Sequence, residues 1–121
     1  MSSGSDRRQA PRASERVPLS ISDGSVEFQV DTKDLSASGV CCVAAQFIPL
    51  MTKVTLRLEV PHGAHRVSIR CTGVIVRIEP IGTPEAPRYN TAVFFTDLSE
   101  QDRGAISRFV RERLSTSTQR N

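Results

Sequence analysis

The chain has 121 residues, 38% of them hydrophobic and 5% aromatic, which suits one domain with a single core and is too short for two. Its formal net charge of +3 is too small to require a nucleic acid or a membrane surface as a partner. The three cysteines, two of them adjacent, fit no disulfide framework or zinc-binding pair, so we expect a cytoplasmic protein without a metal site.

The first sixteen residues differ in composition from the rest of the chain. They are polar and small, and they hold four arginines but too little apolar surface to fold alone. Pro11 disfavours a continuous helix through this segment. We therefore predict that residues 1–16 form a flexible arm, with no apolar core of the kind found in a secretory signal.

From Val17 onward, apolar and polar residues alternate with the period of two that is typical of half-buried strands. This pattern predicts six strands, over residues 17–22, 26–35, 40–44, 54–60, 67–76 and 89–95. Asp23-Gly24 predicts a hairpin turn, and Gly73 predicts a bulge or a sharp bend inside the fifth strand. Residues 80–88 contain three prolines and one glycine, which predicts an irregular loop.

The end of the chain changes to helical spacing. Ser99 and Asp102 have the spacing of a helix N-cap, and apolar residues then recur at intervals of three and four up to Leu114. We predict one helix over residues 100–114 and a disordered polar tail over residues 115–121. The expected fold is thus mainly β, a six-stranded antiparallel barrel over residues 17–114 that includes one C-terminal α-helix.

Two motifs stand out against this background. Residues 34–39 read D-x-S-x-x-G between the second and third strands, and Arg8 and Arg12 read R-x-x-x-R in the arm. Taken singly, the first is typical of a hydrogen-bonded turn and the second of a solvated tail. Together, in this order and strand context, they resemble the PilZ domain, a bacterial family that binds cyclic di-GMP, and the resemblance runs from Arg7 to about Leu114.

The resemblance implies a ligand site made of residues from both motifs. Arginine can donate two N–H groups to a phosphate or to guanine O6 and N7, and an aspartate suits the N1–H and N2–H₂ donors of guanine. A serine can donate to an oxygen, and a glycine permits a positive φ or a close backbone approach. The expected cyclic di-GMP ligands are Arg7, Arg8, Arg12, Asp34, Ser36, Ser38 and Gly39.

Two details of the resemblance are open or unusual. Arg12 and Arg16 also stand four residues apart, but the distance from Arg12 to Asp34 fits the family better. The family often has glycine where this chain has Ala92, and we expect that difference to affect strand packing more than the ligand.

We therefore predict a single-domain cyclic di-GMP receptor whose arm becomes ordered on binding and which signals to an effector protein that the sequence does not identify. It is not expected to be an enzyme, because no nucleophile, base and orienting group can be recognised together. One alternative is a degenerate PilZ-like adaptor that binds a protein partner without the ligand. The other is a small basic barrel that binds single-stranded nucleic acid, although its strands show no row of exposed aromatic residues.

Overall fold

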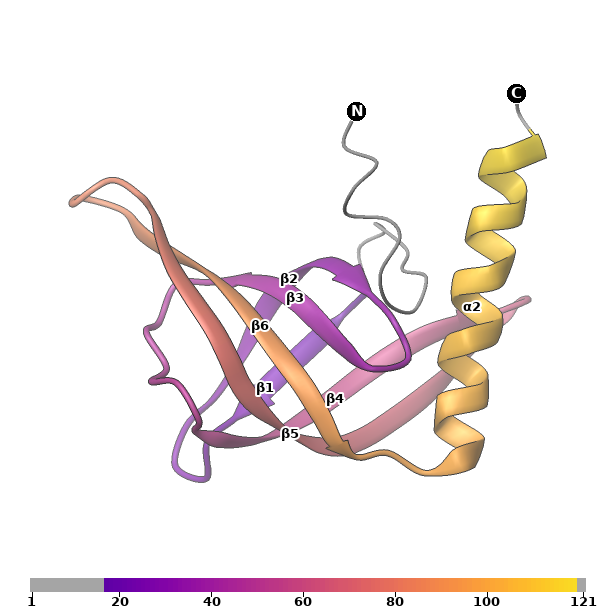
Figure 1. The fold of residues 1–121 in the computed structure, drawn as a ribbon, viewed down its shortest axis with the longest axis horizontal. Helices are drawn as coiled ribbons and strands as arrows, with labels where there is room; N and C mark the ends of the chain where they lie inside the picture. Colours follow the sequence, from indigo (N-terminus) through magenta and orange to yellow (C-terminus); the bar gives the residue numbers. More distant parts are fainter. Residues whose placement is uncertain (1–16, 120–121) are drawn as a thin grey trace.

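The structure, a computed structural model, describes the backbone of residues 17–119 and the side chains of residues 17–114. Six strands close into an antiparallel barrel in the order β1-β2-β3-β6-β5-β4 (Figure 1). The elements are β1 (Leu19–Ser22), β2 (Glu27–Leu35), β3 (Gly39–Ala44), β4 (Lys53–His62), β5 (His65–Gly82), β6 (Pro87–Asp97) and α2 (Glu100–Gln119). The predicted barrel with a C-terminal helix is confirmed, and the predicted arm lies outside the described residues.

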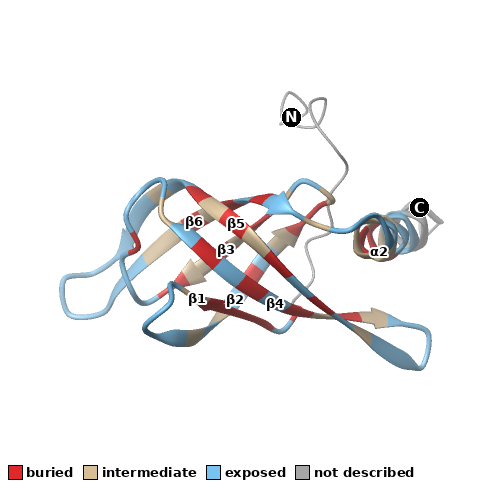
Figure 2. Cartoon of the chain, turned by 90° about the horizontal axis from the view of Figure 1, so that it is seen from below, coloured by how far each residue is buried: buried red, intermediate tan, exposed pale blue. Residues whose placement is uncertain are grey.

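The barrel closes through two pairings between strands that are distant in sequence. Consecutive strands pair as hairpins within β1–β2–β3 and within β4–β5–β6, whereas β1 pairs with β4 and β3 pairs with β6. Within the barrel wall, buried residues alternate with more exposed ones along most of β3, β4, β5 and β6, as the coloured bands in Figure 2 show, whereas three consecutive residues of β1 are buried. The interior is filled by aliphatic side chains, among them Leu19, Ile21, Leu56, Leu58, Ile69 and Ile75. This is a packed core, so any ligand site must lie on the outer wall or at the ends.

Helix α2 lies beside one end of the barrel (Figure 1). The Ser99 hydroxyl caps it by accepting a hydrogen bond of 3.1 Å from the Asp102 N–H, and the buried Ile106, Phe109 and Val110 pack into the core. The helix continues to Gln119, so the predicted helix end at residue 114 is wrong. The predicted disordered tail is likewise wrong for the backbone of residues 115–119, which is helical. No glycine or proline follows residue 114 to stop it. Within the described chain, no helix has the length and apolar character needed to cross a membrane.

The prediction of an irregular loop over residues 80–88 is wrong. Strand β5 continues to Gly82 and β6 begins at Pro87, so these residues form a hairpin that projects from the barrel (Figure 1). Strand β3 makes its last pair with β6 at Tyr89, so beyond that residue the two strands pair only with each other. Prolines are tolerated there because each strand has an open edge that needs no N–H donor.

The first hairpin turn is held by a side chain. The Asp23 carboxylate accepts hydrogen bonds from the N–H groups of Ser25 and Val26, at 3.0 and 3.1 Å. Gly24 follows with a φ of 103°, a left-handed conformation that glycine adopts without strain. The backbone hydrogen bonds from Ser25 and Val26 hold the pKa of Asp23 below its ordinary value. The predicted turn is confirmed, and a carboxylate stabilises it.

Candidate functional site

The turn between β2 and β3 holds itself together by hydrogen bonds. The Ser36 N–H donates to the Gly39 carbonyl at 2.9 Å, and the Ser36 hydroxyl accepts from the Ser38 N–H at 3.2 Å and lies 3.1 Å from the Ser38 hydroxyl. Ser36 is only 7% exposed. Its hydroxyl therefore serves the turn itself, as the simpler interpretation of the motif proposes.

Two other elements fix this turn in place. The Phe95 N–H on β6 donates to the Ser38 carbonyl at 3.0 Å, and the Arg103 guanidinium on α2 donates to the Ala37 carbonyl at 2.9 Å. Sequence reasoning missed Arg103, because 66 residues separate it from Ala37 and no local pattern joins them. The helix thus acts on the turn as a positioning element.

A β-bulge turns Asp34 to the outside of the barrel. Strand β2 pairs Thr32 with Cys42 of β3 and then Asp34 with Cys41, so Lys33 is one residue in excess. In a regular strand, Asp34 would share the inward face with the buried Thr32. The extra residue resets the alternation and places Asp34, half-buried, on the outer wall.

A shallow hollow of about 290 Å³ lies on this outer wall, over β2, β3, β6 and β5. It is lined by Asp34, Ser36, Ser38, Gly39, Val40, Cys41, Val76, Ala92, Val93 and Phe94. The four predicted site residues from the D-x-S-x-x-G motif are thus brought together at one surface. The predicted arginines Arg7, Arg8 and Arg12 lie outside the described residues.

The floor of the hollow contains apolar residues that sequence reasoning did not assign to the site. Val76 is 50% exposed and Phe94 is 51% exposed, although both sit on strands of the barrel wall. Apolar surface beside a few polar groups is typical of sites that bind small organic molecules. The available signal was their outward position in the alternating pattern, which the strand assignment treated only as packing.

Gly39 is required by the barrel's own backbone. It does not have a positive φ, so that part of the expectation is wrong. A Cβ at this position would collide with the carbonyl oxygen of Val93 on β6. A close backbone approach does occur at Gly39, and the approaching group is the neighbouring strand β6.

The adjacent cysteines face opposite sides, as the alternation predicts. Cys42 points into the core, where burial raises its pKa to about 12 and keeps the thiol protonated. Cys41 faces outward, opposite Ala92 of β6, and both line the hollow. Ala92 therefore forms part of the floor of the hollow as well as part of the strand pairing.

Comparison with solved structures finds the same fold in several proteins of low sequence identity. The Bacillus subtilis inhibitor of motility MotI/DgrA is 19% identical, with a TM-score of 0.80, over 92% of this chain and 53% of that one. The PilZ domain of Escherichia coli YcgR with c-di-GMP is 10% identical, with a TM-score of 0.70, over 95% and 97%. The K. pneumonia MrkH–c-di-GMP complex is 16% identical, with a TM-score of 0.69, over 96% and 56%. This chain therefore spans about half the length of the MotI and MrkH chains.

The comparison with curated proteins found no match. The family model described as the PilZ domain matches residues 6–112, which includes both motifs, all six strands and most of α2. With this match over most of its length, and with the fold of solved PilZ structures, the chain belongs to the PilZ domain family.

Proposed function

We propose that the protein is a cyclic di-GMP receptor whose site combines the hollow on the barrel wall with Arg7, Arg8 and Arg12 of the arm. The observation that carries this proposal is the position of the D-x-S-x-x-G residues around an open hollow with an apolar floor, in a chain of the PilZ family. Three relatives of the same fold, YcgR, MrkH and PlzA, have been solved with c-di-GMP.

The root of the arm lies close enough to the hollow for the arginines to reach it. The Val17 carbonyl accepts a hydrogen bond of 2.6 Å from the Thr32 hydroxyl on β2, and Val17 is only 2% exposed. The arm therefore starts beside the strand that carries Asp34. Arg12 is five residues before Val17, and five extended residues span up to about 17 Å.

The residues of the proposed site bind different parts of cyclic di-GMP, according to their chemistry. Asp34 accepts hydrogen bonds from the N1–H and N2–H₂ donors of one guanine, and the apolar floor carries the flat faces of the bases. The arm supplies the cations that the phosphates need, through Arg8 and Arg12 with Arg7 as an auxiliary ligand. Ser36 keeps the turn in shape, whereas Ser38 is exposed and its hydroxyl lies at the hollow.

The output of binding is a change of surface. The ligand bridges residues 1–16 and the barrel of residues 17–114, and orders the arm against the outer wall. An effector protein then recognises the combined surface of arm and barrel, so the protein signals by association and performs no catalysis.

Calorimetric titration with cyclic di-GMP tests this proposal. We expect Arg12→Ala and Asp34→Ala each to lower the affinity about ten- to a hundredfold, because a hydrogen bond to a charged group contributes ~1.5–3 kcal/mol. The matched controls are Arg16→Ala, in the other possible arginine pair, and Asp31→Ala, an exposed carboxylate on the same strand. Both controls are expected to bind like wild type.

Other outcomes of the same titration favour the alternatives. A wild-type protein that shows no heat and no thermal shift with cyclic di-GMP, yet retains its protein partner, is a ligand-independent adaptor. Binding to single-stranded nucleic acid that weakens steeply with salt, without a response to cyclic di-GMP, identifies a nucleic-acid protein. Loss of binding in Arg16→Ala with normal binding in Arg8→Ala would move the arginine pair to Arg12 and Arg16.

A further inference from the structure

A second β-bulge faces the first one across the hollow. Strand β5 pairs Ile75 with Val93 of β6 and then Arg77 with Ala92, so Val76 is one residue in excess. Ile75 is fully buried, whereas Val76 and Arg77 are both exposed. In a regular strand, Arg77 would follow Ile75 into the barrel interior. The bulge instead turns its guanidinium to the outer wall.

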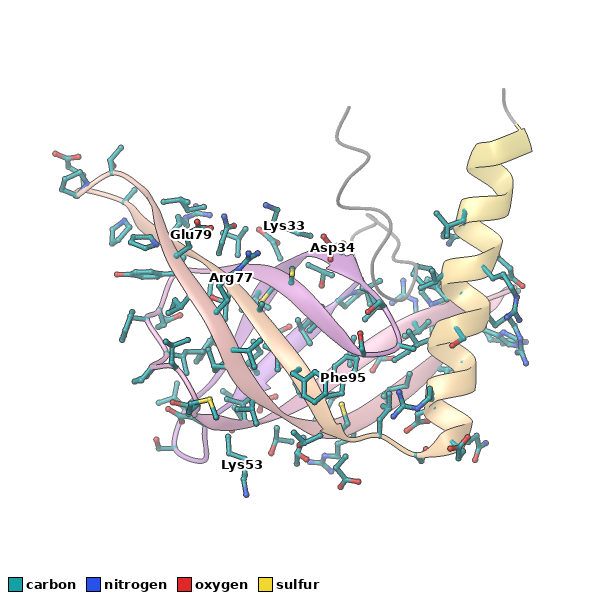
Figure 3. The ribbon with its side chains drawn as sticks, viewed as in Figure 1. Lys33, Asp34, Lys53, Arg77, Glu79 and Phe95 are labelled. Carbon is teal, nitrogen blue, oxygen red and sulfur yellow. The ribbon has the colours of Figure 1, made fainter. Side chains whose placement is uncertain are left out.

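The two bulges place residues of opposite charge in one row. The registers pair Arg77 of β5 with Ala92 of β6, Ala92 with Cys41 of β3, and Cys41 with Asp34 of β2. Figure 3 shows Asp34 and Arg77 on the same side of the barrel. Three strand spacings separate them, about 14 Å along the sheet. The positions between them carry the small side chains of Cys41 and Ala92, which leave the row open.

Arg77 has no structural task that explains its position. It makes no hydrogen bond or ion pair with any other residue between 17 and 114, and Glu79, on the same face of β5, forms no ion pair with it. The bulge is not needed merely to keep a charge out of the core, because an apolar residue at position 77 could face the barrel interior of a regular strand. A bulge also interrupts the strand ladder, and bulges are common beside sites, where they re-aim a side chain.

We infer that Arg77 binds the second guanine of cyclic di-GMP, at the opposite end of the row from the guanine that Asp34 binds. This inference rests on the proposed function and assigns its specificity. Cyclic di-GMP is symmetric, with a guanine at each end and the phosphates between them. A guanidinium donates two parallel N–H groups to guanine O6 and N7, whereas adenine offers a donor in place of O6. Both ends of the site then select guanine.

Titration with two ligands tests the inference directly. Wild type, Arg77→Ala and the control Arg70→Ala are each titrated with cyclic di-GMP and with the mixed dinucleotide 3′,3′-cyclic GMP–AMP. Arg70 is an exposed arginine on the same strand that pairs with Arg57 of β4, away from the row, and its removal changes the net charge equally. Wild type and Arg70→Ala are expected to prefer cyclic di-GMP about tenfold or more.

The two ligands separate the possible outcomes. If Arg77 reads the second guanine, Arg77→Ala loses about tenfold for cyclic di-GMP and little for the mixed dinucleotide. The preference of Arg77→Ala for cyclic di-GMP over the mixed dinucleotide then becomes small. It reflects only that the symmetric ligand can bind in two equivalent orientations. An equal loss for both ligands places Arg77 on a phosphate and overturns the inference, as does an unchanged preference. A wild type that binds neither ligand overturns the proposed function and the inference with it, whereas normal wild-type binding with an unaffected Arg77→Ala overturns the inference alone.

Discussion

Gly39 shows how a residue of a binding motif can be required by the fold. Its missing side chain lets β3 approach β6 at Val93, at the edge of the hollow. Ser36 likewise uses its hydroxyl inside the turn. Of the motif residues, Asp34 offers a charged group to the outer wall, while Gly39 and Ser36 hold the surface from which it projects.

A single methyl group at residue 39 is expected to destabilise the protein. Gly39→Ala places a Cβ against the Val93 carbonyl, and backbone cannot move aside as a side chain can, so we expect a loss of about 1–3 kcal/mol in the free energy of unfolding. Gly104→Ala is the matched control, because nothing lies within 4 Å of its Cβ position on α2. There we expect no loss, or a gain of up to about 1 kcal/mol. Urea denaturation measures both; similar midpoints for the two variants would contradict the assignment.

At the scale of the strands, local sequence patterns predict that a strand exists, but they do not predict features such as bulges that depend on its pairing with other strands. The alternation of apolar residues identified all six strands, and Gly73 marks a real register shift, although the extra residue there, Thr96, belongs to β6. The bulges at Lys33 and Val76 were not predictable, because a bulge is defined by the residue opposite it on another strand. Since they decide the faces of Asp34 and Arg77, the side chains on the outer wall around the hollow were predicted only in part.

The projecting β5–β6 hairpin was missed for a different reason. Its prolines are strong loop signals, and they lower the expectation of a strand wherever both edges must pair. Here Pro80 and Pro87 lie where β5 and β6 pair with each other alone. The sequence contains no local sign that the other edge of each strand is open, because that depends on where β3 and β4 end.

The turn between β1 and β2 gives a prediction about pH. Backbone hydrogen bonds lower the pKa of Asp23 in the folded protein, so its carboxylate contributes stability above the ordinary value of 3.8 and loses that contribution as the pH falls through the lowered pKa. Asp23→Ala should therefore lower the urea midpoint at pH 7. In acid below the lowered pKa, the difference between variant and wild type should disappear.

The exposed carboxylate at residue 31 provides the comparison for this prediction. Asp31→Ala removes the same charge from the middle of β2 without removing a turn, so its urea midpoint should stay close to that of wild type at both pH values. A difference for Asp23→Ala that persists in strong acid would show that the side chain acts through something other than its ionised carboxylate.

At the scale of the whole molecule, the hollow lies across the seam between the two halves of the chain. The first half contributes β1 to β3 and the second half β4 to β6, and strands of the two halves pair at two seams, where β3 pairs with β6 and where β1 pairs with β4. A ligand bound over β2, β3, β6 and β5 contacts both halves at the first seam and neither at the second.

Hydrogen exchange can detect this asymmetry. With saturating cyclic di-GMP, amides of the β3–β6 pairing, from Gly39 to Ala44 and their partners on β6, should exchange more slowly than in the apo protein. Amides of the β1–β4 pairing should gain less protection, because a ligand in the hollow does not contact that seam and does not suppress its local opening. Equal protection of the two seams would place the ligand elsewhere or show that the barrel opens only as a whole.

The seam also bears on the lifetime of the protein. Both closing pairings join residues far apart in sequence, and pairings of this kind are slow to form when a chain folds. A messenger that binds both sides of one pairing makes the opened state rarer, and an opened barrel is what a protease needs. When the messenger is abundant, the protein should therefore be degraded more slowly, and its amount as well as its surface would follow the signal.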